Sequence, residues 1–103
     1  MSRPFSYNDE NFTVIDNVLF VHFKYEESAE IGTRLIEIPP AISDRLLFFS
    51  NMFTVTYDKK NSNSGQTIMT IINYNGKNYL TNRANITGAS GKYFFGIFML
   101  KDI

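Results

Sequence analysis

The sequence predicts a single all-β domain, an antiparallel β-sandwich of about seven or eight short strands. β-Branched and aromatic residues gather in short runs, with ten Phe and six Tyr among 103 residues, and these residue types are enriched in strands. Turn signals separate the runs about every 8–12 residues, as in sandwiches and barrels. Phe53, Val55 and Tyr57 also alternate with polar residues, which is the period of a strand with one wet face.

Local signals place the elements in order. Strands are expected at 12–15, 18–25, 33–38, 47–58, 66–74, 77–81, 84–87 and 92–100. Asp16-Asn17 and Asn75-Gly76 tolerate positive φ, so each predicts a tight two-residue hairpin turn. Pro39-Pro40 ends the third strand because proline cannot donate to a ladder. Residues 41–46 are the only helical candidate, with one short turn at most, and residues 59–65 are expected to form a polar loop.

The domain boundary is expected after residue 11. Residues 1–11 are predicted to form an N-terminal docking arm, and residues 12–103 a single sandwich domain. Pro4, Phe5 and Tyr7 are the expected anchors of the arm, since an extended segment can dock apolar side chains against a neighbour. The N-terminus has no apolar signal core, and no nearby apolar run approaches the length of a membrane span. We expect a protein that is made in the cytosol and stays soluble.

The composition argues against several classes of function. Ten basic and ten acidic residues cancel, which disfavours a nucleic-acid binder. The absence of cysteine excludes disulfides, thiolate zinc sites and a cysteine nucleophile. The single histidine, His22, lies in an apolar strand, where a packed or interface role is commoner than catalysis. No carboxylate spacing forms a known metal cage, and no Gly-rich phosphate loop is present. We therefore expect no enzyme, no cofactor and no metal.

Two expected strands are apolar on both faces. In the last strand, one face carries Tyr93, Phe95, Ile97 and Met99, and the other carries Phe94, Gly96, Phe98 and Leu100. A strand of this kind must be covered on both sides. The cover comes either from the chain's own loops, arm and segment 39–46, or from a neighbouring subunit. We favour the subunit, and expect the oligomer interface to contain Phe20, His22, Phe94, Phe98 and Leu100.

The second hairpin is a candidate for ligand binding. Tyr74, Asn75, Asn78 and Tyr79 lie together there, and exposed tyrosines with amide side chains suit stacking and hydrogen bonding to sugars. Asn and Gly are also the residues that hairpin turns require. The pattern therefore leaves both a sugar-binding loop and a plain turn open.

The order of short motifs resembles a known group of proteins. The motifs are Phe-Thr-Val-Ile-Asp-Asn-Val-Leu-Phe-Val-His-Phe (12–23), Ile-Glu-Ile-Pro-Pro-Ala-Ile (36–42), Tyr-Asn-Gly-Lys-Asn-Tyr-Leu (74–80) and Ile-Thr-Gly-Ala-Ser-Gly-Lys-Tyr-Phe-Phe (86–95). This order is similar to that of the small β-sandwich modules of tailed-bacteriophage tail fibres and head fibres. Residues 4–23 are also similar to small virion proteins of gut phages, including crAss-like ones. The resemblance implies a jelly-roll-like domain, commonly trimeric, attached to a capsid or tail, with no catalytic residues. The chain has no long repetitive shaft, which favours a stand-alone decorating protein or a short head fibre over a fibre tip.

We therefore expect a non-enzymatic structural component of a tailed-phage virion. It would be a head fibre or capsid-decorating protein rather than a tail-fibre tip, made in the host cytoplasm. It would form a homo-oligomer, a trimer before a dimer, and attach to another virion protein through its arm. The alternative is a soluble β-sandwich module that binds a host-surface glycan or protein through loops at one end.

Overall fold

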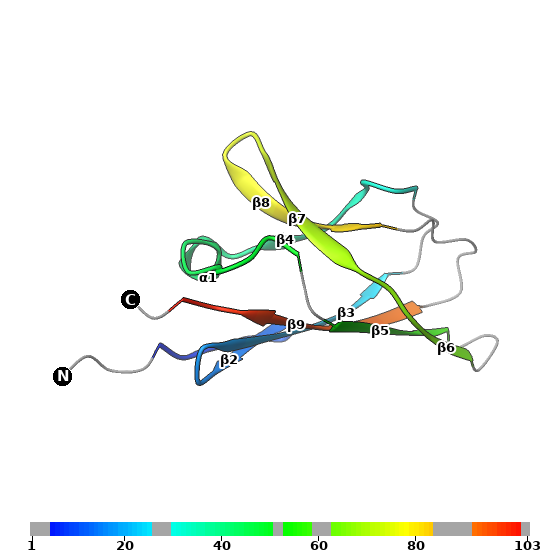
Figure 1. The fold of residues 1–103 in the computed structure, drawn as a ribbon, viewed down its shortest axis with the longest axis horizontal. Helices are drawn as coiled ribbons and strands as arrows, with labels where there is room; N and C mark the ends of the chain where they lie inside the picture. Colours follow the sequence, from blue (N-terminus) through cyan, green and yellow to red (C-terminus); the bar gives the residue numbers. More distant parts are fainter. Residues whose placement is uncertain (1–4, 26–29, 51–52, 59–62, 84–91, 102–103) are drawn as a thin grey trace.

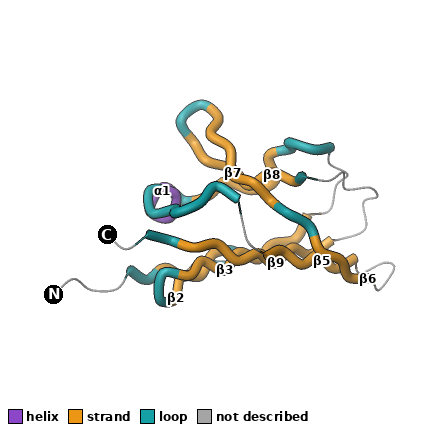
Figure 2. Tube along the Cα trace, viewed as in Figure 1, coloured by secondary structure: helices purple, strands orange, loops and turns teal. Residues whose placement is uncertain are grey.

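The structure is a computed structural model that describes residues 5–25, 30–50, 53–58, 63–83 and 92–101. Two antiparallel sheets face each other in two layers (Figures 1 and 2). The larger sheet has the strand order β1-β2-β3-β9-β5-β6, and the smaller has the order β4-β8-β7. In chain order the elements are β1 (Tyr7–Asn8), β2 (Phe12–Ile15), β3 (Val18–Tyr25), β4 (Arg34–Ile38), α1 (Pro40–Ser43), β5 (Phe53–Asp58), β6 (Asn63–Gln66), β7 (Met69–Tyr74), β8 (Lys77–Asn82) and β9 (Lys92–Met99). The predicted all-β sandwich is confirmed.

Both predicted hairpins form with the expected turn chemistry. Asp16 and Asn17 have φ of 50° and 63°, and Asn75 and Gly76 have φ of 51° and 81°. Positive φ at both central residues is the signature of a type I′ turn, whose twist matches that of the flanking strands. These turns fix the registers of β2 against β3 and of β7 against β8. The predicted helical turn is present as α1, which begins at the second proline of the pair, where a missing N–H costs nothing.

The long-range strand pairs are nested. β3 pairs with β9 in the larger sheet, and β4 pairs with β8 in the smaller sheet. After β3 the chain passes to β4 of the smaller sheet, returns to the larger sheet for β5 and β6, crosses again for β7 and β8, and ends in β9 of the larger sheet. The sheets have six and three strands rather than four each. This nesting makes β3 and β9 the central strands of the larger sheet, so both of their edges are paired.

Several boundaries differ from those expected. The strand expected at 66–74 begins only at Met69, because Gln66 belongs to β6 and pairs with Val55 of β5. Residues 47–50 were expected to begin a strand that starts in the structure only at Phe53. The Leu47 N–H donates to the Met99 carbonyl of the larger sheet, and the Ile71 N–H of the smaller sheet donates to the Phe49 carbonyl. The segment crosses between the sheets and so cannot continue one ladder.

Residues 63–65, expected in a polar loop, belong to the edge strand β6. This strand pairs with β5, and main-chain pairing at an edge needs no apolar side chain. The expected strand at 84–87 lies outside the described residues.

The core fills the space between the sheets. Phe23 and Phe94, from the paired strands β3 and β9, stack with ring centroids 5.0 Å apart inside it. Its buried apolar residues are Phe12, Val14, Leu19, Val21, Phe23, Ile38, Ile42, Leu46, Met69, Ile71, Leu80, Phe94, Phe98 and Leu100. Both sheets and α1 contribute to this single cluster, so the described strands form one folding unit.

Candidate interaction face

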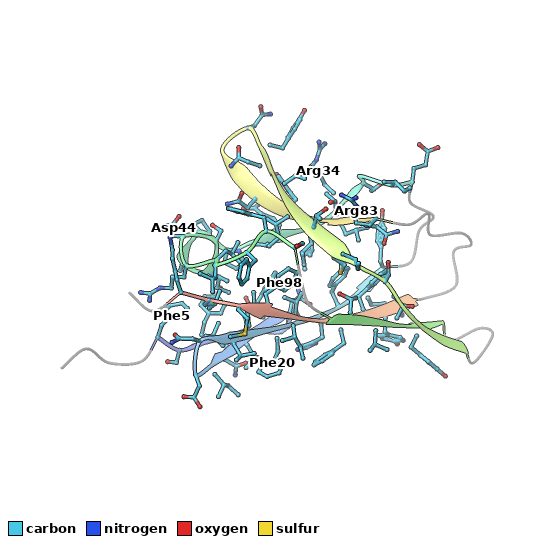
Figure 3. All side chains as sticks on the ribbon, in the orientation of Figure 1. Phe5, Phe20, Arg34, Asp44, Arg83 and Phe98 are labelled. Carbon is cyan, nitrogen blue, oxygen red and sulfur yellow. The ribbon has the colours of Figure 1, made fainter. Side chains whose placement is uncertain are left out.

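The larger sheet carries exposed aromatic residues on the side turned away from the core. We call this surface the outer aromatic face; it consists of Phe20, His22, Val55, Tyr57, Tyr93 and Phe95. Tyr57, Tyr93 and Phe95 keep 41%, 40% and 39% of their surface exposed. Figure 3 shows Phe20 and Phe98 on opposite sides of the larger sheet. In the isolated chain these rings face water rather than protein.

Cross-strand pairing holds the aromatic rings together. Phe20 and Phe95 have ring centroids 6.1 Å apart, and Tyr57 and Tyr93 have ring centroids 6.4 Å apart. The second pair is directly opposed in the register of β5 against β9. Cross-strand aromatic pairs of this kind each stabilise a sheet by about 0.2–1 kcal/mol. The face is therefore a fixed surface built on the central strands.

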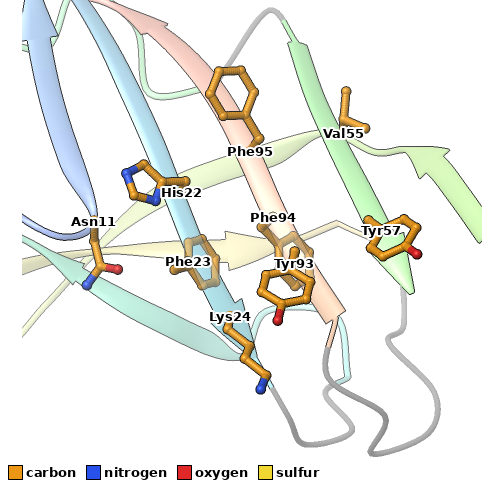
Figure 4. A pocket seen from close by; sticks show the side chains of 9 residues that line it. All are labelled: Asn11, His22, Phe23, Lys24, Val55, Tyr57, Tyr93, Phe94 and Phe95. Carbon is orange, nitrogen blue, oxygen red and sulfur yellow. The ribbon is translucent and has the colours of Figure 1, made fainter. Parts of the chain in front are cut away.

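A hollow of about 390 Å³ adjoins this face, and five of the six face residues line it (Figure 4). Its lining comes from β3, β5 and β9 and from the residue that precedes β2. The lining residues are Asn11, His22, Phe23, Lys24, Val55, Tyr57, Tyr93, Phe94 and Phe95. The Lys24 ammonium lies 5.7 Å from the centre of the Tyr93 ring, within the range of a cation–π contact. The hollow combines aromatic walls with an imidazole, an ammonium and an amide.

The structure corrects three of the five expected interface residues. Phe94, Phe98 and Leu100 are buried in the chain's own core, with 2%, 1% and 4% of their surface exposed. The exposed side of β9 carries Tyr93 and Phe95 instead. Successive side chains of a strand point to opposite faces, so a register error of one residue exchanges the inward-facing residues for the outward-facing ones. Both faces of this segment are apolar, and alternation alone gave no means of choosing between them.

The other two expected interface residues, Phe20 and His22, lie on the outer aromatic face. Phe20 is half-buried and His22 is exposed. Val55, Tyr57, Tyr93 and Phe95 belong to the same face but were not among the expected interface residues. The alternation of Phe53, Val55 and Tyr57 with polar residues was visible in the sequence and is typical of a strand with its polar side in water, but the structure buries Thr54 and turns Tyr57 outward.

Part of the expected docking arm belongs to the sandwich. Tyr7 and Asn8 form β1, which pairs with β2 at the edge of the larger sheet. Phe5 packs against the core cluster, and the Arg45 guanidinium lies 4.0 Å from the centre of its ring. The third expected anchor, Pro4, lies outside the described residues. Apolar side chains near a chain end can pack on their own domain as well as on a partner, and Phe5 and Tyr7 do so here.

Asp9 organises the turn between β1 and β2. Its Oδ1 accepts the N–H groups of Asn11 and Phe12, both at 2.8 Å, and its Oδ2 accepts the Tyr7 hydroxyl at 3.1 Å. Partial desolvation raises the pKa of Asp9, but these hydrogen bonds and the nearby His22 outweigh it, so the pKa is lowered. Desolvation and the Asp9 carboxylate raise the pKa of Tyr7. Asp9 therefore stays ionised near neutral pH and fixes the edge beside the outer aromatic face.

The candidate ligand hairpin stands apart from this face. Tyr74, Asn75, Asn78 and Tyr79 lie in the β7–β8 hairpin of the smaller sheet, which projects at the top of Figure 1. The Arg34 guanidinium lies 3.8 Å from the Tyr74 ring centre and 5.7 Å from that of Tyr79. Arg34 therefore covers one face of the Tyr74 ring. No pattern in the sequence predicts this contact, because Arg34 reaches the hairpin from β4.

A second exposed apolar group lies in the segment between the sheets. Leu47, Phe48 and Phe49 are each about half exposed, and they follow the bridge between Leu46 and Leu100. Within the described part of the chain, no three Asp, Glu or His side chains come together as a metal site. No helix among the described residues has the length and apolar character to cross a membrane.

No protein-family model, curated protein or solved structure gives a significant match to this chain. Its functional assignment therefore rests on the geometry described above and on the short motifs of the sequence.

Proposed function

We propose that this protein is a non-enzymatic structural component that assembles with copies of itself through the outer aromatic face. The observation that carries the proposal is the exposure of aromatic residues across β3, β9 and β5, the centre of the larger sheet. Monomeric proteins seldom expose large contiguous apolar patches, and such patches mark interaction sites. Aromatic residues are also enriched in the cores of protein interfaces.

The dimensions of the face suit a homo-oligomer interface. The face lies on three strands spaced about 4.8 Å apart, and eight residues rising about 3.3 Å each give it a surface of roughly 14 by 26 Å. A standard interface buries about 800 Å² of accessible surface on each partner. The projected area of the face, roughly 370 Å² before side-chain relief, is about half of that value, and side-chain relief raises the accessible area above it.

We propose a tailed-phage virion as the setting, as a head fibre or capsid-decorating protein. This part rests on the short motifs at 12–23, 36–42, 74–80 and 86–95 and on the sandwich fold that accompanies them. Attachment to another virion protein would use the N-terminal residues that precede β1. Because Phe5 and Tyr7 pack on the sandwich, the docking surface would combine this arm with the adjoining sheet edge.

The first test is the absolute mass of the purified protein in solution, measured by light scattering over a dilution series. We expect an oligomer at low micromolar concentration, and we expect Phe95→Ser to reduce it to a monomer that remains folded. The matched control is Ile72→Ser, which changes an exposed apolar residue of the smaller sheet and should leave the mass unchanged. A wild-type protein that is monomeric at all concentrations would refute self-assembly.

The glycan-binding alternative has less structural support. One face of the Tyr74 ring is covered by Arg34, and the Asn73 amide donates to Asn78 at 3.4 Å within the hairpin. Both contacts occupy groups that would otherwise be available to a sugar.

A further inference from the structure

The only histidine of the chain lies inside the outer aromatic face. His22 is exposed on β3, directly opposite Phe95 of β9 in the strand register. On its other side, its main-chain N–H donates to the Asn11 carbonyl at 2.9 Å. Phe20 and Lys24 flank it on the same face of β3. A partner that covers Phe20 and Phe95 must therefore also remove His22 from water.

The face is self-complementary in charge when two copies meet with antiparallel strands. Lys24 lies near the end of β3, and Asp16 lies in the turn that precedes the start of β3. These two residues are separated along the strand by eight residues, or about 26 Å. Antiparallel stacking of two larger sheets brings Lys24 of each copy towards Asp16 of the other. Opposite charges at the rim of an interface steer the two partners into the matching orientation.

Burial would make the charge state of His22 decisive for association. An imidazole that is neutral can be covered by aromatic rings at little cost, whereas an imidazolium loses its hydration and needs a partner. The titratable side chains that share the hollow are Lys24 of β3, Tyr93 of β9 and Tyr57 of β5. Asp9, in the β1–β2 turn, is the carboxylate that acts on His22.

The surrounding charges do not replace the lost hydration. The oxygens of Asp9 already accept hydrogen bonds from Asn11, Phe12 and Tyr7. Lys24, on the same face of β3, carries a positive charge and offers no counter-ion to an imidazolium. Desolvation by the second copy therefore remains the dominant change on association.

We infer that a second copy of this chain covers the outer aromatic face, and that mild acid releases it by protonating His22. The inference rests on the proposed self-assembly and adds its pH dependence. Histidine is the side chain whose charge ordinarily changes between pH 5 and 8. If only the neutral form associates, the dissociation constant rises about tenfold per buried histidine between pH 7.5 and pH 5.5.

The test is light scattering of the wild-type protein over a dilution series at pH 7.5 and pH 5.5. We expect an oligomer at pH 7.5 that dissociates at pH 5.5, with its midpoint concentration raised at least about tenfold. His22→Asn and His22→Phe should both abolish this pH dependence, one retaining a neutral polar group and the other an apolar ring. Asp9→Asn should retain it, because the lowered pKa of Asp9 keeps that carboxylate ionised across the range.

The outcomes separate the two proposals. An oligomer whose dissociation constant is the same at both pH values would overturn the inference and leave self-assembly standing. A monomer at both pH values would overturn both. A pH response that survives both His22 substitutions would assign the proton to another group and would also overturn the inference.

Discussion

Replacing Phe98 with alanine distinguishes the two possible directions of strand β9. Phe98 is 1% exposed and lies in the core between the sheets, so its truncation removes a buried ring and leaves a cavity. Substitutions of buried Phe by Ala cost about 3–5 kcal/mol. Small domains have a total stability of about 5–15 kcal/mol, so the loss is a large fraction of it. For a domain of this size, 3 kcal/mol corresponds to a fall in Tm of about 12 °C or more.

The matched control is Phe95→Ala, which lies three residues earlier in β9 and on the opposite side of the same sheet. Phe95 is 39% exposed and touches Phe20, so its truncation should cost about 1 kcal/mol in the isolated chain. Thermal unfolding followed by circular dichroism at two protein concentrations separates loss of fold from loss of association. If Phe98→Ala kept its Tm but lost its oligomeric mass, while Phe95→Ala unfolded, the inward assignment of Phe98 would be refuted.

Two further substitutions test local structure. Asp9→Ala removes the acceptor of two main-chain N–H groups and should cost about 1 kcal/mol in urea unfolding at pH 7, with Glu10→Ala near zero. Because the pKa of Asp9 is lowered on folding, its contribution to stability is present above about pH 4 and is lost as the pH falls through the folded-state pKa. The unfolding free energies of Asp9→Ala and Glu10→Ala should therefore become equal in acid. Gly76→Ala should lower the free energy of unfolding by about 1–2 kcal/mol, because its φ of +81° strains a residue that carries a Cβ. The added Cβ meets no atom within 4 Å, so the loss is conformational and not steric. Gly65→Ala, without positive φ, should be nearly neutral; an equal loss at both glycines would contradict the turn assignment.

The sequence was sufficient for features whose cause is local. Asp16-Asn17 and Asn75-Gly76 identified both hairpins, because positive φ at two consecutive positions is compatible with few residue types. The proline pair at 39–40 marked the end of β4 and the start of α1, because proline lacks the N–H that a strand ladder needs and its fixed φ suits the first turn of a helix. Strand content followed from β-branched and aromatic runs bounded by turns. Part of the candidate face could be predicted from the sequence. Residues 93–100 are apolar on both sides, and a strand of this kind needs cover on both sides.

Tertiary structure alone decided which side of β9 faces inward. Phe94 and Phe98 are no more apolar than Phe95, and the choice depends on where the smaller sheet lies. That position is set by long-range pairs such as β4 with β8, which no short window of sequence contains.

The same reason explains the contacts of Arg34 with Tyr74 and of Arg45 with Phe5. In both cases residues far apart in the chain are brought together by the sandwich. Alternation along a strand determined that each side chain has one of two directions, and the packing of the two sheets determined which.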